Sequence, residues 1–404
     1  MHDQREIPQQ KSDYGCFFNE KDSLNNFLIE KIDVLMEMNR EDKERCVQAI
    51  VQTILEDPDQ KQKNLQTFSI EKISNLSKFS LVYKVKCNDK IYVLRLLLTN
   101  NQAQENAAEE IKIMQLFAAS KIAPKIYYVS ELTYTVVMDY VDSEQFWHAN
   151  ITPDKRKAIC EILRAMNITA SEPASLGQEN KKINDIYANA NNCCFQFYPD
   201  NSYLDNYRAV VFETFKELKE ICDQYPCDGI CHGDFQMFNM LYKTEEKNFS
   251  IIDWEYYRRG SRLFDLAYLM INIQADETVE REFLAEYLEI SVSDIPESDW
   301  AKYYIMKQYI LTYRIIFFLG LCSSFDFILD LSPDKIKDLP CFKDLTYKII
   351  KDQNLELSSD LGLFQLSVMH LKDFNEVLND KCYQEMLFMA KEAIKLTSQK
   401  SFGM

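Results

Sequence analysis

Residues 230–267 read ICHGDFQMFNMLYKTEEKNFSIIDWEYYRRGSRLFDLA and carry the most informative pattern in the chain. This segment holds a His-Gly-Asp triplet ending at Asp234, then Asn239 five residues later, and two short apolar runs around the polar turn Lys243–Asn248. Apolar runs flanking a polar turn predict a β-hairpin. The hairpin would return Asp253, at the end of its second strand, to the side of Asn239.

These three oxygen-bearing side chains suit phosphoryl transfer. That reaction needs an acid to orient the attacking hydroxyl and oxygen ligands for Mg²⁺ on the nucleotide phosphates. Asp234 fits the role of catalytic base, and Asn239 and Asp253 fit the role of metal ligands. A lone Asp-x-x-x-x-Asn mostly marks a turn, whereas the full ordered set is far more specific. His232, taken by itself, is more often a structural residue, and we expect it to brace the catalytic loop.

The segment resembles the choline/ethanolamine kinase and aminoglycoside phosphotransferase superfamily, whose fold is like that of protein kinases. Residues 231–234 (CHGD) are similar to its catalytic loop. Residues 252–256 (IDWEY) and 264–267 (FDLA) look closest to the choline kinase branch, because the antibiotic kinases usually carry a small residue after the metal-binding Asp. The resemblance extends more weakly over Glu71–Leu321 and implies that Asp265 ties down the catalytic loop.

The rest of the chain fits a two-lobed α+β fold with a small β-rich lobe and a large, mostly helical lobe. Strand patterns at Ser80–Lys86, Lys90–Leu97, Ile126–Val129 and Thr133–Met138 surround a helical pattern at Gln104–Ser120. After residue 142 helical periodicity dominates. We predict an N-terminal helical extension at 1–63, a nucleotide-binding lobe at 64–142, and a lobe at 143–404 with the catalytic loop, metal site and acceptor pocket. Within that lobe the predicted helices are Leu266–Ile273, Glu280–Leu288, Trp300–Leu321 and Gln365–Leu396.

The resemblance also implies a nucleotide site. Arg95 matches the strand position of the phosphate-contacting Lys or Arg, and Glu110 matches the acid that holds it, with Glu109 as the fallback. The hinge that would bind adenine through its backbone is Met138, Asp139, Tyr140 and Val141.

The small lobe contains no glycine. The segment that corresponds to the phosphate loop therefore offers Ser77, Ser80 and backbone N–H groups, and close approach to phosphate is harder without glycine.

The acceptor side is predicted from aromatic residues that could hold a quaternary ammonium, with a nearby acid. The candidates are Glu255, Tyr256, Tyr313 and Phe317. An aromatic stripe at helical spacing is more often core, and the tryptophan pair typical of eukaryotic choline kinases is missing. A cationic acceptor would be repelled by the nearby arginines, Arg258, Arg259 and Arg262. These arginines could instead attract an anionic acceptor.

Composition limits the remaining classes. A formal charge of -17 argues against nucleic-acid binding, which needs clustered basic residues, and is compatible with a cationic substrate. No apolar run is long enough to span a bilayer, and the scattered cysteines fit a reduced cytoplasmic setting without zinc. A homodimer is compatible with the sequence, which does not fix the oligomeric state.

The sequence thus predicts an ATP- and Mg²⁺-dependent kinase of a small-molecule hydroxyl, with choline or ethanolamine as the leading acceptor. The alternatives are a kinase of another acceptor on the same fold (aminoglycoside, sugar, lipid head group or protein) and a non-catalytic pseudokinase that binds partners.

Overall fold

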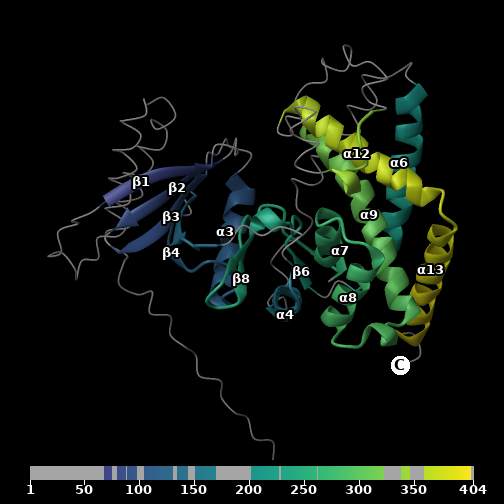
Figure 1. Ribbon diagram of the computed structural model, residues 1–404, viewed down its shortest axis with the longest axis horizontal. Coiled ribbons are helices and arrows are strands. Elements are labelled where there is room, and N and C mark those ends of the chain that lie inside the picture. Colours follow the sequence, from purple (N-terminus) through teal and green to yellow (C-terminus); the bar gives the residue numbers. More distant parts are fainter. Residues whose placement is uncertain are drawn as a thin grey trace, which may run out of the picture. The chain divides into compact units, whose positions relative to one another are not determined.

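The computed structural model describes residues 68–74, 80–87, 89–97, 104–130, 134–143, 151–169, 202–226, 229–261, 263–322, 338–345 and 359–401 (Figure 1). The predicted N-terminal helices, Ser77, Arg262 and the side chain of Ser80 lie outside the described residues. By its contacts the chain divides into two compact units, one holding residues up to 104 together with 126–140, and one holding 105–125 and everything from 141 onward.

The first unit contains one antiparallel sheet of five strands in the order β1-β2-β3-β5-β4. The strands are β1 (Phe68–Ser74), β2 (Ser80–Cys87), β3 (Lys90–Leu97), β4 (Ile126–Ser130) and β5 (Thr135–Asp139). Val85, Leu94, Val136 and Val137 are fully buried in the middle strands. β-Branched and aliphatic side chains suit such a pleated, buried surface, and the strands predicted for β2 to β5 are confirmed within two residues at each end.

The second unit is mostly helical. It comprises α3 (Gln104–Ala119), α4 (Pro153–Thr169), α6 (Ser202–Cys222), α7 (Leu263–Asn272), α8 (Glu277–Leu288), α9 (Glu297–Leu321), α12 (Asp360–Leu378) and α13 (Lys381–Ser401), with short 3₁₀ turns at η3 (Met237–Asn239), η4 (Val292–Asp294) and η6 (Phe342–Asp344). α9 contacts α6, α7, α12 and α13 and is buried on nearly every face. A helix that is apolar all round is expected to be surrounded in this way.

The single helix predicted at Gln365–Leu396 is wrong, because the structure has two helices there. α12 ends at Leu378, and the side chain of Asp380 accepts a hydrogen bond from the backbone N–H of Cys382, in the first turn of α13. Asn379 and Asp380 are residues whose side chains favour turns and helix caps over helix interiors, which explains the break.

Helix α3, which the prediction grouped with the small lobe, shares its contacts with the second unit. Phe117 stacks on Trp254 with ring centroids 4.2 Å apart, and Tyr257 donates a hydrogen bond of 2.8 Å to Glu109. The backbone N–H of Ile251 bonds the carbonyl of Ile122 at 2.7 Å. These contacts attach α3 to the segment that carries Asp253.

Residues 229–260 form two small two-stranded sheets in the second unit. β7 (Met240–Lys243) pairs with β8 (Asn248–Ile251), and β6 (Gly229–Cys231) pairs with β9 (Arg258–Gly260). The β7–β8 hairpin is the predicted one; the short β6–β9 pair was not predicted, because three-residue strands carry almost no periodic signal.

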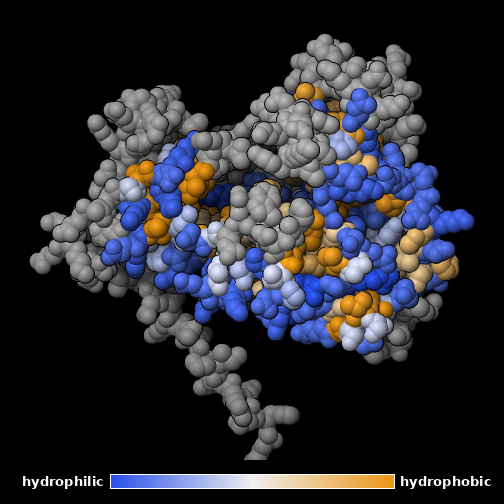
Figure 2. Space-filling model, in the orientation of Figure 1, coloured by the Kyte–Doolittle hydropathy of each residue, from blue (hydrophilic) through white to orange (hydrophobic). Residues whose placement is uncertain are grey.

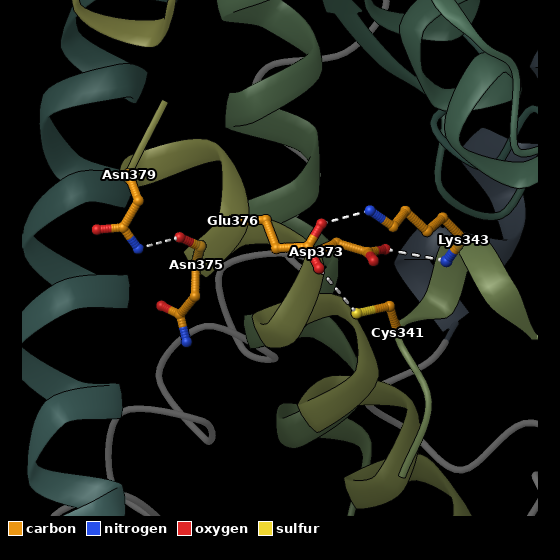
Figure 3. A network of polar contacts seen from close by, with 6 residues as sticks. All are labelled: Cys341, Lys343, Asp373, Asn375, Glu376 and Asn379. Atoms are coloured by element: carbon orange, nitrogen blue, oxygen red, sulfur yellow. Dashed lines mark hydrogen bonds and ion pairs between the residues drawn. The ribbon is translucent and has the colours of Figure 1, made fainter. Parts of the chain in front are cut away.

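The turn η6 is fastened to α12 by polar contacts (Figure 3). The backbone N–H of Lys343 donates to Asp373 at 3.1 Å, and its ammonium pairs with Glu376. Gln274 donates to the carbonyls of Phe342 and Leu345 at 2.7 and 3.0 Å. Phe342 is thereby held over residues of α9 and α12.

No helix in the described ranges is long and apolar enough to cross a membrane. On the face shown in Figure 2, hydrophilic residues cover most of the described surface, and hydrophobic residues form small separate patches.

Candidate active site

The loop after β6 is built around a glycine with a positive φ. Gly233 has φ of 84°, and a Cβ there would lie 1.9 Å from the carbonyl oxygen of Tyr256. Only glycine can combine this backbone conformation with such a close approach. The glycine of the His-Gly-Asp triplet is therefore a geometric requirement of the chain crossing at Tyr256.

Asp265 fixes the same loop from the first turn of α7. Its carboxylate accepts hydrogen bonds from the backbone N–H of His232 at 2.6 Å and of Gly233 at 3.0 Å. Asp265 is 2% exposed, and burial raises its pKa while these hydrogen bonds act in the opposite direction. The carboxylate satisfies two buried donors that would otherwise lack partners.

His232 links the loop to the strand that leads to Asp253. Its Nε2 lies 2.9 Å from the carbonyl oxygen of Ile252, so Nε2 carries the proton and donates it. Nδ1 then accepts from the backbone N–H of Asp234 at 3.3 Å. The ring is fully buried and packs beside Trp254 at 4.7 Å between centroids. These contacts give His232 a structural role, because they hold the loop in place.

Asp234 is held by three side chains. Tyr268 donates to Oδ1 at 2.7 Å, while Gln236 and Asn239 donate to Oδ2 at 2.8 and 2.9 Å. The side chain of Asp234 is only partly buried. A carboxylate fixed in this way, with access to solvent, has the pre-organisation that a general base requires.

Asn239 and Asp253 are brought together by the hairpin register. Met240 pairs with Ile251, and one step further the N–H of Ile252 bonds the carbonyl of Asn239 at 3.0 Å. Asp253 follows directly, with φ of 67°. Aspartate tolerates this left-handed conformation better than most residues, and such strain collects at functional sites.

The donor set fits magnesium. Because the amide nitrogen of Asn239 donates to Asp234, its Oδ1 is the atom that can serve a metal. No group of three His, Cys, Asp or Glu side chains suitable for a metal occurs among the described residues. Mg²⁺ commonly binds through one or two protein oxygens, with phosphates and water completing its shell. Asn239 and Asp253 would hold it.

The predicted nucleotide contacts fall in both units. Arg95 is a mostly buried residue of β3, and Glu110 is a buried residue of α3, so they belong to different units and their pairing stays a prediction. In the predicted hinge, Met138 and Asp139 end β5. The N–H of Tyr140 donates to the carbonyl of Ile91 at 3.3 Å. That N–H is thus used within the sheet, where Met138 and Asp139 are also paired with β3, and adenine binding by the hinge stays a prediction.

The structure brings three of the predicted acceptor residues together. Phe317 lies 5.2 Å from Tyr256 and 5.7 Å from Tyr313 between ring centroids. All three are buried, whereas Glu255 is partly exposed. The guanidinium of Arg258 lies 3.6 Å from the ring centroid of Phe264 and 5.8 Å from that of Tyr313. A cation of the protein itself therefore already faces part of this aromatic cluster.

Sequence reasoning missed Gln236, Tyr268 and Arg314. Tyr268 had a usable signal, since it lies three residues after Asp265 and helix geometry places such residues on one face. Arg314 had no such signal, because the sequence of an apolar helix does not indicate which element an arginine within it will contact.

Comparison with known proteins gives a consistent family. A model described as "Phosphotransferase enzyme family" matches residues 70–304, more than half of the chain. A probable acyl-CoA dehydrogenase of Arabidopsis thaliana is 32% identical over 98 residues, which cover 19% of this chain. The chain matches only 12% of that curated relative's length.

Solved structures agree on the fold. A choline/ethanolamine kinase family protein from Mesorhizobium loti superposes with a TM-score of 0.55 at 14% identity, covering 85% of this chain and 98% of that one. The choline kinase LicA from Streptococcus pneumoniae gives 0.54 at 17% identity, covering 82% and 99%. The GDP and kanamycin complex of APH(2")-IIIa gives 0.51 at 13% identity, covering 83% and 99%. The predicted two-lobed kinase-like fold is confirmed.

Proposed function

Since this chain belongs to the phosphotransferase enzyme family, we propose that it transfers the γ-phosphate of ATP to a hydroxyl group of a small molecule. The observation that carries the proposal is the carboxylate of Asp234, which Tyr268 and Asn239 hold at 2.7 and 2.9 Å in a partly exposed loop beside Asp253. The nucleotide donor is supported by the GDP complex named among the similar structures.

In this proposal Asp234 accepts the proton of the attacking hydroxyl and orients its oxygen toward the phosphorus. Asn239 and Asp253 hold Mg²⁺, which, when bound, offsets the charge of the phosphates. His232 and Asp265 keep the loop in place and touch neither substrate. The nucleotide would be bound by the lobe at 64–142 through Arg95 and the hinge, with Glu110 holding Arg95.

We propose the chemical class of the acceptor first and its identity second. A hydroxyl-bearing small molecule follows from the family, and choline or ethanolamine is the finer prediction, supported by the names of similar kinases. Another acceptor on the same fold is the second candidate, favoured by one observation: the cation of Arg258 stands over Phe264 and near Tyr313, where an ammonium ion would have to bind. The positive charge of Arg258 would repel a second cation at the same rings.

The test is consumption of ATP or GTP with Mg²⁺ across a panel of amino alcohols, sugars, aminoglycosides and lipid head groups. Asp234→Ala should lower turnover at least ~10²-fold, as loss of a positioned base generally does. Asp253→Asn is the matched metal-site variant, because asparagine also tolerates a positive φ and the fold should survive. It should lower turnover and raise the Mg²⁺ concentration needed for half-maximal rate.

Glu245→Ala, in the exposed turn of the hairpin, is the control and should behave like wild type. A pseudokinase would show no Mg²⁺-dependent turnover in wild type, and unfolding of Asp234→Ala by circular dichroism would mean that this residue is structural.

A further inference from the structure

A buried guanidinium lies one side chain behind the candidate base. Arg314, on α9, is 4% exposed, and among the described residues its Nε and Nη1 atoms have no hydrogen-bonding partner. Its Cζ lies 5.1 Å from the ring centroid of Tyr268, whose hydroxyl bonds Oδ1 of Asp234 at 2.7 Å. Arg314 is therefore close to the reacting end of the site without pairing with Asp234.

Other unmet hydrogen-bonding groups surround it. Both ring nitrogens of His370 and the Oδ1 of Asp373, on α12, are buried and also lack partners in the described part of the chain. His370 shares two aromatic neighbours with Arg314. Phe342 lies 4.0 Å from the His370 ring and 5.0 Å from the Arg314 Cζ, and Phe318 lies 5.6 and 5.4 Å from them. The Asp373 carboxylate acts electrostatically on Arg314. Arg314, His370 and Asp373 are called here the α9–α12 polar cluster.

Packing alone does not explain this cluster. Rings on Tyr268, Phe318 and Phe342 attract the Arg314 cation, but they cannot accept its N–H groups as an oxygen does. Two partly exposed arginines do find oxygen: Arg164 donates to the carbonyl of Glu286 at 2.6 Å, and Arg281, which also faces a ring, bonds Glu277 at 2.7 Å. Arg156 and Arg258 each have one buried nitrogen without a partner in the described ranges, whereas Arg314 has two. Buried charges in proteins are ordinarily paired or hydrogen-bonded. Within the described ranges two N–H-bearing atoms of Arg314 thus have no oxygen acceptor, and the anionic group of a ligand could supply one.

We propose that the acceptor carries an anionic group, a carboxylate or a phosphate, which binds Arg314 while its hydroxyl group lies at Asp234. This rests on the proposed kinase function and specifies its substrate class. A guanidinium suits either anion because it can donate two parallel hydrogen bonds. His370 can add a further hydrogen bond from α12. The buried Arg314 and the partly exposed Arg258 make the same region unfavourable for a free quaternary ammonium.

The first experiment varies only the charge of the acceptor. Ethanolamine, ethylene glycol and glycolate share a two-carbon skeleton, and choline, glycerol, glycerate and glycerol 3-phosphate extend the series. With ATP and Mg²⁺, kcat/KM should be at least tenfold higher for an anionic member than for its neutral counterpart. Turnover confined to ethanolamine, choline or the neutral alcohols would overturn the proposal while leaving the kinase function standing.

The second experiment does not depend on turnover. At constant ionic strength, glycolate and inorganic phosphate should raise the midpoint of thermal unfolding of the wild type by binding the folded state. Arg314→Met should lose this effect, Arg314→Lys should keep part of it, and Arg281→Met, the matched control, should keep all of it. An anion effect absent from the wild type, or fully retained in Arg314→Met, would refute the site even if no acceptor is phosphorylated.

For an acceptor that is phosphorylated, Arg314→Met should raise KM about 10- to 100-fold, the factor expected for a lost charge-assisted hydrogen bond. If Arg314→Met fails to fold, the wild-type charge series and Arg314→Lys still decide the question. Equal KM values for anionic acceptors in wild type and Arg314→Lys, with no preference in the series, would count against it.

Discussion

The hydroxyl group of Tyr268 donates a hydrogen bond of 2.7 Å to Oδ1 of Asp234. Tyr268 lies on α7, 34 residues after Asp234, and is 3% exposed. Burial raises the pKa of Tyr268 well above its usual value, so the phenol keeps its proton and remains a donor. The loop that carries the candidate base is therefore positioned by one helix twice, through Tyr268 and through Asp265.

Tyr268→Phe should lower kcat about tenfold with little change in KM for ATP, because a base that is free to rotate spends less time in the reactive geometry. Steady-state kinetics would measure both parameters. Tyr225→Phe is the control, since the buried hydroxyl of Tyr225 has no partner among the described residues. An unchanged kcat in Tyr268→Phe would show that Gln236 and Asn239 suffice to hold the carboxylate.

Gly233→Ala should destabilise the protein by more than about 2 kcal/mol and abolish turnover, because the backbone has φ of 84° and the new Cβ would meet the carbonyl of Tyr256. Denaturant unfolding would measure the loss. Gly260→Ala is the comparison: its Cβ would lie 3.2 Å from the sulfur of Cys231, without a positive φ. A Gly233→Ala variant as stable as Gly260→Ala would contradict the chain crossing described here.

Asp265→Ala should cost about 2–4 kcal/mol of unfolding free energy, because the N–H groups of His232 and Gly233 would lose their acceptor inside the protein. Turnover should fall with it, through displacement of Asp234. Asp276→Ala removes a helix cap at an exposed site, where the carboxylate accepts from Val279 at 2.9 Å. That control should cost about 1 kcal/mol and leave turnover unchanged.

Asp373 should make the protein less stable as pH rises. Burial raises the pKa of its carboxyl from 3.8 to about 6. Between these values the unfolded chain has already released the proton that the folded chain still holds, so this contribution to stability is complete below about pH 4 and lost above about pH 6. Asp373→Asn keeps an acceptor for the Lys343 N–H (Figure 3) and removes the titration.

The unfolding free energy at pH 7.5, relative to pH 4, should therefore be higher in Asp373→Asn than in wild type, by up to about 2 kcal/mol. Urea unfolding at both pH values gives this difference. Glu376→Gln is a control with the opposite sign. The hydrogen bond from Lys343 lowers the pKa of Glu376, so the contribution of Glu376 to the unfolding free energy is lost as pH falls. A change of the same sign in both variants would refute the assignment.

Much of the candidate site follows from neighbouring residues in the sequence. The spacing from Asp234 to Asn239 and the polar turn between two apolar runs dictate a hairpin, and its register alone sets Ile252 opposite Asn239. The predicted strands and helices of this region were confirmed for the same reason, since periodicity and turn residues act over a few positions. The break at Asn379–Asp380 was missed because helical periodicity on both sides outweighed two turn residues.

The hairpin that carries Asp253 can be read from the sequence, because its geometry follows short-range backbone rules. The kinase-like fold and the catalytic loop were expected from the resemblance to a known superfamily. Their surroundings became visible only in the folded chain. The contact of Tyr268 with Asp234, and the burial of Arg314 beside His370, arise where helices far apart in the sequence pack together. Which faces meet depends on the whole core, and no local pattern encodes it.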